Sequence, residues 1–351
     1  MKLNLTSGPG VPEFSQLVPL FWIYFVEGLA LVACNSVIFC SILYHPILRE
    51  KKEYALPAAL ALCDTLDGLS ACLAGLGRNL MIYKGTEYEL VTRYHCLTTP
   101  WNFFWIIPQH VLDPTLLAIS IDRLIAVRYP LFHYGLSRSY GTFVVCCAWL
   151  PGLLGVAYCH WTSSQLEPIK NRFSICYTDY SFQDAYYFLH KTVRVVCSSL
   201  SVLLYVPILL LIHIRGKPNS LAVPAQIKEY NRAQQKLTIT LGISCLFTAI
   251  FYVIPSYGRG MLGFLNLNMN SGTAAVVVPG TYVVENVNKL ANLFLYSLRH
   301  KNLRLGIKYF LLRKELTLAA LLNVGAVSEK SVKVKPKKGL KKIKVLPARP
   351  E

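Results

Sequence analysis

The stretch 97–127, LTTPWNFFWIIPQHVLDPTLLAISIDRLIAV, decides the fold of this chain. It is apolar and exceeds the roughly 20 helical residues that cross the hydrocarbon core of a bilayer. The same length of mainly apolar sequence recurs on both sides of it, at residues 17–44, 54–83, 140–160, 186–214, 237–261 and 273–296. The pattern predicts an all-α membrane protein that crosses the bilayer seven times.

Composition excludes an ordinary soluble domain. Apolar residues make up 54% of the chain and charged residues 15%, against roughly a quarter charged in soluble proteins. The net charge of +18 could indicate nucleic acid, but the basic residues lie mostly in alternate joints between apolar stretches and in the C-terminal tail. That distribution is typical of membrane topology, so we expect no nucleic-acid partner.

Basic residues in the joints predict the orientation. Arg49, Lys51 and Lys52 fill the first joint, and further clusters precede the sixth stretch and follow the seventh. These joints should face the cytosol, which places the N-terminus outside and the C-terminus inside. An outside N-terminus agrees with a glycosylation sequon at Asn4.

The chain therefore divides into four expected parts. Residues 1–16 form an extracellular tail, and residues 17–297 form the membrane domain. Residues 298–312 alternate basic and apolar side chains at helical spacing, which predicts an amphipathic helix on the inner leaflet. Residues 313–351 form a basic cytosolic tail that anionic membrane lipid should attract.

Ionisable side chains inside the predicted spans invite a functional interpretation, because each costs several kcal/mol in lipid unless it is paired. Asp64 lies near the middle of its span, and three asparagines occupy the inner halves of theirs. Two interpretations stay open for this set: one hydrated polar cluster that switches, or a satisfied structural network. Its members are Asn35, Asp64, Asn288 and Asn292. Other in-span charges support a channel or transporter as the alternative: Asp67, Asp113, Glu285 and Lys289.

The run Ser120-Ile121-Asp122-Arg123-Leu124-Ile125-Ala126-Val127, followed by Pro130, resembles the Asp-Arg-Tyr region of rhodopsin-like (class A) G-protein-coupled receptors. Near the end of the seventh stretch, Asn292-Leu293-Phe294-Leu295-Tyr296 resembles the family's Asn-Pro-x-x-Tyr motif. Further single-residue matches follow the family's order along the chain: Asn35, Asp64, Trp149, Pro207 and Pro255.

The resemblance implies a seven-transmembrane helix bundle with a short amphipathic eighth helix, and a function without covalent chemistry. It assigns residues to four roles. The switches at the G protein would be Asp122, Arg123, Asn292 and Tyr296. A polar hinge, with a sodium ion near Asp64, would consist of Asn35, Asp64, Asn288 and Asn292. Helix kinks would lie at Pro207 and Pro255, and an extracellular disulfide would join Cys96 to Cys176. Cys159 could compete for either partner of that disulfide. No other cofactor, no metal site and no enzyme motif is visible in the sequence.

Several positions depart from the family's pattern. Leu124 replaces its Tyr, Leu293 replaces its Pro, and helix six lacks the Trp two residues before Pro255. Gln235 stands where many members carry an acid that holds Arg123, so ligand-free signalling could exceed the usual level. These departures, with the sequence Arg299-His300-Lys301-Asn302-Leu303-Arg304, resemble the nematode chemoreceptor-like branch.

We expect a plasma-membrane receptor that passes an extracellular signal to heterotrimeric G proteins. Trp105 stands where amine receptors carry an Asp, which argues against a biogenic amine. A basic, aromatic-lined pocket would suit an anionic or neutral odorant-like molecule or a peptide carboxylate, although its basic residues could instead reach lipid headgroups. Its candidate residues are Trp101, Trp105, His110, Arg194 and Tyr257. The rivals are a channel or transporter, and a diverged receptor fold that does not signal.

Overall fold

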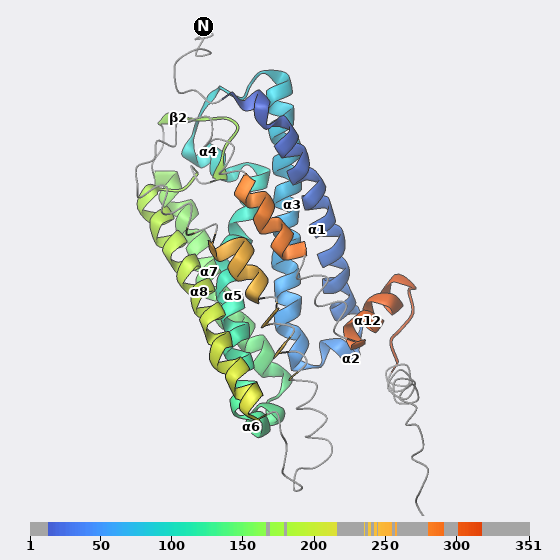
Figure 1. The fold of residues 1–351 in the computed structure, drawn as a ribbon. Coiled ribbons are helices and arrows are strands. Elements are labelled where there is room, and N and C mark those ends of the chain that lie inside the picture. The colour runs from blue at the N-terminus through green and yellow to red at the C-terminus, as the bar shows by residue number, and fades with distance from the viewer. Residues whose placement is uncertain are drawn as a thin grey trace, which may run out of the picture.

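The computed structural model describes residues 13–165, 169–178, 181–215, 280–290 and 301–317, together with 235, 238–239, 242–243, 245–254 and 257. Long helices dominate this part of the chain and run side by side (Figure 1). They coincide with the first five predicted stretches: α1 (Val18–Tyr44), α3 (Ala55–Lys84), α5 (Pro100–Arg128), α7 (Arg138–Gln165) and α8 (Asp184–Arg215). The prediction of an all-α architecture is confirmed for the described residues.

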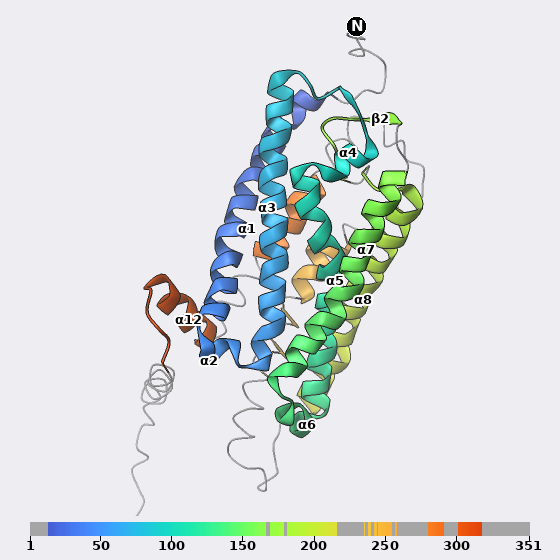
Figure 2. The same cartoon turned by 180° about the vertical axis from the view of Figure 1, so that it is seen from behind.

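Four of these helices are long and apolar enough to cross a membrane, which makes the chain a multi-pass membrane protein. They are α1, α3, α7 and α8, and α5 is the exception within the described residues. Helix α5 lies in the centre of the bundle and packs against α3, α7 and α8 (Figure 2). A helix enclosed by protein on most sides can carry polar residues such as Gln109, His110 and Asp113 that lipid would not accept.

The sixth and seventh predicted stretches are described in part. Residues 245–254 are helical and include the π-helix η4 (Ala249–Val253), which contacts α8. Residues 280–290 form a helix against α1 and α3, because Asn286 bonds Glu27 and Lys289 bonds Asp67. These two segments are the amber and orange pieces in the middle of Figure 1. Pro255, Asn292, Tyr296 and Asn4 lie outside the described residues.

A small antiparallel sheet covers the end of the bundle that the sequence predicts to be extracellular. Strand β1 (Leu90–Thr92) pairs with β2 (Lys170–Phe173), with Leu90 opposite Phe173 and an irregularity after Val91. The short helix α4 (Arg93–Thr98) follows, and its first turn is capped by Thr92 Oγ1, which accepts from the His95 N–H at 3.0 Å. The sheet therefore fastens the connection before α5 to the connection before α8.

Short helices form the opposite end: α2 (Pro46–Arg49), η2 (Lys52–Tyr54), α6 (Pro130–Gly135) and α12 (Lys301–Leu311). Helix α12 coincides with most of the predicted amphipathic segment and packs on the corner between α1 and α2. The buried His45 holds it there, because Nε2 contacts the Gly306 carbonyl at 3.0 Å and Nδ1 accepts from the Leu316 N–H at 3.3 Å. One neutral tautomer, with the proton on Nε2, satisfies both contacts.

Glycines set the close approach of α1 and α3. A Cβ added at Gly28 would collide with backbone atoms of Cys72 and Gly68, and one at Gly75 would collide with the backbone of Phe21 and Phe25. Small residues let two membrane helices pack backbone to backbone, where van der Waals contact replaces the hydrophobic effect. Asp64 and Asp67 on α3 owe their fixed distance from α1 to this contact.

The substitution Gly28→Leu should lower the thermal stability of the purified protein, because its side chain has no space between α1 and α3. Overpacking of this kind costs about 1–3 kcal/mol. Melting temperature in detergent measures the effect. The control is Gly135→Ala at the end of α6, where nothing lies within 4 Å of the added Cβ. Equal melting temperatures for both variants would contradict the described packing.

Candidate functional site

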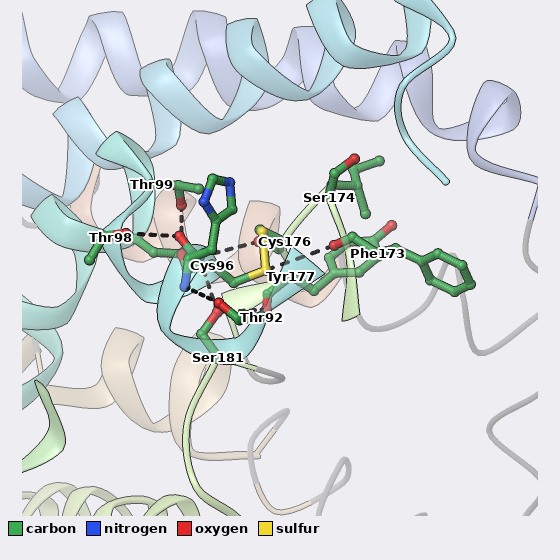
Figure 3. Close-up of a disulfide and its surroundings, with 12 residues drawn as sticks. Thr92, Cys96, Thr98, Thr99, Phe173, Ser174, Cys176, Tyr177 and Ser181 are labelled. Atoms are coloured by element: carbon green, nitrogen blue, oxygen red, sulfur yellow. Dashed lines mark hydrogen bonds between the residues drawn. A yellow bond between two sulfur atoms is a disulfide. The ribbon is translucent and has the colours of Figure 1, made fainter. Parts of the chain in front are cut away.

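The expected disulfide joins Cys96 on α4 to Cys176 in the connection before α8, with 5.0 Å between the two Cα atoms (Figure 3). Cys159, the predicted competitor, is a free thiol buried on α7. A disulfide lowers the conformational entropy of the unfolded chain. Here it also holds the connection before α8 against the end of the bundle. The connection is thus tied down before α8 begins.

Hydrogen bonds from α3 and α5 also hold the connection before α8, at Cys176. The Cys176 carbonyl accepts from Arg78 Nη2 at 3.1 Å, from Asn102 Nδ2 at 3.3 Å and from Trp101 Nε1 at 3.4 Å. Cys176 itself has a φ of 46°, in the left-handed region that non-glycine residues rarely adopt. We name this group, Arg78, Cys96, Trp101, Asn102 and Cys176, the extracellular clamp. Trp101, predicted to line a ligand pocket, serves the clamp.

Asn102 is the fully buried centre of the clamp. Its Nδ2 donates to the Cys96 carbonyl at 2.8 Å and contacts Ser181 Oγ at 3.1 Å, and its Oδ1 accepts from Thr178 Oγ1 at 2.8 Å. A single amide therefore links both half-cystines and the residues that follow the disulfide. The sequence offered little signal for Asn102, because one Asn near the end of an apolar stretch is common.

The predicted pocket residues separate into different surroundings. Trp105 and His110 are buried in an aromatic cluster with Tyr186, whose hydroxyl lies 2.6 Å from His110 Nε2 and donates to the Gly155 carbonyl. Tyr257 is 51% exposed, and its hydroxyl lies 3.1 Å from Ser199 Oγ on α8. The structure brings Trp105 and His110 together and leaves Tyr257 at the surface.

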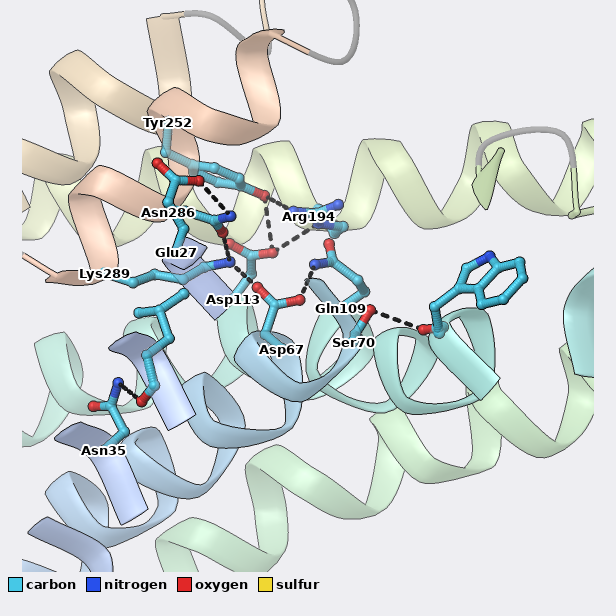
Figure 4. A network of polar contacts seen from close by, with 12 residues as sticks. Glu27, Asn35, Asp67, Ser70, Gln109, Asp113, Arg194, Tyr252, Asn286 and Lys289 are labelled. Atoms are coloured by element: carbon cyan, nitrogen blue, oxygen red, sulfur yellow. Dashed lines mark hydrogen bonds and ion pairs between the residues drawn. The ribbon is translucent and has the colours of Figure 1, made fainter. Parts of the chain in front are cut away.

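Arg194, the fifth predicted pocket residue, lies deeper, in the middle of the bundle. Its Nε donates to Asp113 Oδ2 at 3.0 Å, and Nη2 donates to the Tyr252 hydroxyl, which itself donates to Asp113 Oδ2 at 3.1 Å (Figure 4). Ser198 Oγ donates to the other Asp113 oxygen. The carboxylate of Asp113 is completely buried, so these donors replace the water that it lost on folding.

A second ion pair lies nearby, between Lys289 in residues 280–290 and Asp67 on α3. Asp67 also accepts from Gln109 Nε2 on α5 at 3.4 Å, and Lys289 contacts Asn286 Oδ1 at 3.4 Å. Asn286 in turn donates to Glu27 on α1 at 3.2 Å. Among the described long helices, the two ion pairs and their partners connect α1, α3, α5 and α8. We name this group the mid-bundle network. Its members are Glu27, Asp67, Gln109, Asp113, Arg194, Ser198, Tyr252, Asn286 and Lys289.

The polar hinge predicted around Asp64 has a different geometry. Asn35 Nδ2 donates to the Leu31 carbonyl of its own helix at 3.1 Å, and Asn288 Nδ2 donates to Thr248 Oγ1 at 3.3 Å. Asp64 is buried one turn from Asp67, and no hydrogen bond joins it to Asn35 or Asn288 in the described part of the chain. Of the in-span charges that support a channel or transporter as the alternative, Asp67, Asp113 and Lys289 belong to the mid-bundle network.

The end of the bundle predicted to face the cytosol holds the Asp122-Arg123 pair. The Arg123 guanidinium bonds Asp122 Oδ2, while Asp122 Oδ1 lies 3.0 Å from His133 Nε2 on α6. Both members of the pair are about 97% buried. Lys52 then fixes α6, because its Nζ donates to the carbonyls of Tyr134 at 3.3 Å and Leu136 at 2.9 Å and to that of His133. We name Lys52, Asp122, Arg123 and His133 the cytosolic lock.

A cleft opens beside the cytosolic lock, between η2, α3, α5 and α7, and Lys52, Asp122, Arg123 and His133 line it with Tyr140. Tyr205 on α8 is buried within electrostatic range of Arg123. Pro207 lies two residues further along α8 and is exposed, well beyond the polar contacts of Arg194 and Ser198. Sequence reasoning missed His133 and Lys52, since neither lies in an apolar stretch where a polar residue is conspicuous.

Comparison with known families gives one finding. The family model "Serpentine type 7TM GPCR chemoreceptor Srsx" matches residues 31–309, which include the mid-bundle network except Glu27, the whole cytosolic lock and the extracellular clamp. A search among curated proteins found no match.

Coupling between Asp67 and Lys289 can be measured by a double-mutant cycle. Lys289→Met leaves the Asp67 carboxylate buried without its cation and should cost about 3 kcal/mol or more. Asp67→Asn combined with Lys289→Met should cost less than the two single losses together, because neither charge then remains unpaired. Thermal unfolding in detergent reports each value.

Lys84→Met, at an exposed position at the end of the same helix α3, is the control and should have little effect. Additive single losses at Asp67 and Lys289 would show that the ion pair does not stabilise the bundle.

Proposed function

The chain belongs to the Srsx family of serpentine seven-transmembrane chemoreceptors, and we propose that it passes an extracellular ligand signal to heterotrimeric G proteins. In this proposal it crosses the plasma membrane seven times, with a glycosylated N-terminal tail outside and the C-terminus in the cytosol. Residues 280–290 and 245–254 belong to the seventh and sixth spans, and α12 lies on the inner leaflet as the eighth helix. Distribution of basic residues among the joints supports this orientation.

The observation that carries the proposal is the state of Arg123. A guanidinium at the cytosolic end of α5 is buried against Asp122, and Arg123 is only 3% exposed. A buried Arg can exchange one carboxylate for other acceptors, including the backbone carbonyls of a partner's helix end. Arg123 therefore acts as the group that is released toward the G protein, and Asp122 holds it in the resting arrangement.

His133 and Lys52 set how firmly Arg123 is held. His133 occupies the second oxygen of Asp122, and Lys52 fixes the helix that carries His133. Movement of α6 would break the contact with His133 and weaken the hold on Arg123 in the same step. Such a lock supplies the two arrangements that a ligand must bind unequally in order to signal.

The mid-bundle network supplies the connection between the two ends. Arg194 of α8 and Tyr252 of η4 meet on one carboxylate of α5, so a shift of either helix changes the contacts of the other. The π-turn in η4 supports a role in movement, because π-helices are uncommon and concentrate at functional sites. Asp64, Asn288, Asn292 and Tyr296 remain members of the proposed switch, with a sodium ion near Asp64.

Two alternative functions make different predictions: a channel or transporter, and a receptor fold that does not signal. In a channel or transporter, the in-span charges would face a water-filled path, whereas Asp113 and Asp67 are paired and buried. A receptor fold that does not signal would bind its ligand without effect on nucleotide exchange.

Arg123→Ala should leave the receptor at the cell surface and abolish its activation of G proteins. Nucleotide exchange on a panel of Gα subunits in membranes that contain the full chain measures this. The control Arg138→Ala removes an exposed arginine at the start of α7 and should retain activity. Normal exchange with Arg123→Ala would refute the role of Arg123.

His133→Phe should raise ligand-independent nucleotide exchange by about tenfold, because a hydrogen bond to a charged group contributes about 1.5–3 kcal/mol to the resting arrangement. His133→Gln keeps a donor that can reach Asp122 and should stay closer to the unmodified receptor. Unchanged basal exchange with His133→Phe would show that this contact does not restrain Arg123.

A further inference from the structure

We propose that the side chain of Phe182 occupies the receptor's ligand site, and that the ligand is a neutral, flat aromatic molecule with a single hydrogen-bonding group that His190 binds. The inference rests on the proposed function, since it names the ligand class for that receptor. We call the site the Phe182 cage: Trp105, His110, Tyr186, Tyr187 and His190 around Phe182.

Rings surround Phe182 on several sides. Its ring centroid lies 5.7 Å from that of His190, 5.9 Å from Trp105 and 6.0 Å from Tyr187, and the Tyr187 ring is stacked on it. His110 and Tyr186 follow at 6.4 and 6.1 Å. Phe182 is 1% exposed although it precedes α8, in the connection on the extracellular side. A connection rarely buries a large apolar side chain so fully inside a helix bundle.

The position of Phe182 depends on packing, while its neighbours are fastened by hydrogen bonds. Ser181 is tied to Asn102 at 3.1 Å and to the Tyr177 carbonyl at 3.2 Å. A phenyl ring has no polar group, so a ligand ring that replaced it would restore the same aromatic contacts. The extracellular clamp would keep the connection in place while one side chain gives way.

His190 indicates where a polar group of the ligand would bind. It is 93% buried on α8, and among the residues that the structure describes its Nε2 has no hydrogen-bond partner, whereas both ring nitrogens of the stacked His110 have contacts. The two imidazole centroids are 4.1 Å apart. Leaving a buried polar atom unpaired costs about 1–3 kcal/mol, which a ligand with one suitable group would recover.

The cage also explains how a neutral ligand could act. No acidic or basic side chain other than histidine belongs to it, so the walls do not select a charged molecule. His190 lies one helical turn from Arg194 on α8, and both cage histidines are within electrostatic range of that guanidinium. A group bound at His190 would therefore act next to the Asp113–Arg194 pair of the mid-bundle network.

Binding of small aromatic probes to the purified full chain in lipid nanodiscs tests the proposal. Phe182→Ala opens space for one ring, and an apolar cavity of that size takes up an aromatic molecule. Indole should bind this variant at least about tenfold more tightly than it binds the unmodified receptor. The control is Phe103→Ala, near Trp105 at the first turn of α5. It removes a phenylalanine that is 47% exposed and should leave the indole affinity unchanged.

A second substitution tests His190. Phe182→Ala should prefer indole to indene, a ring system of the same shape without the N–H, and adding His190→Phe should remove that preference while indene still binds. If Phe182→Ala fails to fold, Phe182→Leu keeps the connection apolar and should show the same order with a smaller gain.

Two results would overturn the proposal: no gain in indole affinity with either Phe182 variant that folds, or an indole preference that survives His190→Phe. Neither readout involves a G protein. If indole binds but nucleotide exchange on Gα subunits does not occur, the proposed function is contradicted. If exchange occurs but indole does not bind, the assignment of the Phe182 cage as the ligand site is contradicted.

Discussion

The pairing of buried charge is the constraint on which this structure depends. An isolated ion in the hydrocarbon region costs several kcal/mol, so a charged in-span side chain is stabilised by a partner on another helix. Asp67 meets Lys289, and Asp113 meets Arg194. Because the partners belong to different helices, the pairs fix the relative positions of α3, α5, α8 and residues 280–290. A single change in partner must then move a helix.

The same principle operates at both ends of the bundle with different chemistry. At the end predicted to face the cytosol, Asp122 divides its two oxygens between Arg123 and His133, so one carboxylate holds both a helix end and the neighbouring α6. At the other end, backbone carbonyls take the place of carboxylates as acceptors: Arg78 donates to the Cys176 carbonyl, and Asn102 donates to the carbonyls of both half-cystines. Between them lies the Phe182 cage, in which aromatic packing replaces pairing and His190 Nε2 has no hydrogen-bond partner in the described part of the chain.

Much of the architecture was predictable from local sequence. Hydrophobic length gave the five long helices within a few residues, and the alternating pattern after residue 297 indicated α12. Motif position gave Asp122 and Arg123, and the disulfide followed from the resemblance to receptors. The polar hinge was less accessible, because a motif places Asn35 and Asp64 on helices without saying which side chains meet. Asn35 bonds its own helix instead, and Asp67 carries the connection to Lys289.

The sequence by itself determined that this chain is a multi-pass helical membrane protein, because apolar length is a property of each segment alone, and its motifs carried the resemblance to the chemoreceptor-like branch. Only the tertiary structure decided which charges pair, that His133 contacts Asp122 while Lys52 bonds the backbone of α6, and that Phe182 enters the bundle. Those contacts join residues many positions apart in the chain. Their energies depend on distances between elements, which tertiary packing sets and no local sequence pattern encodes.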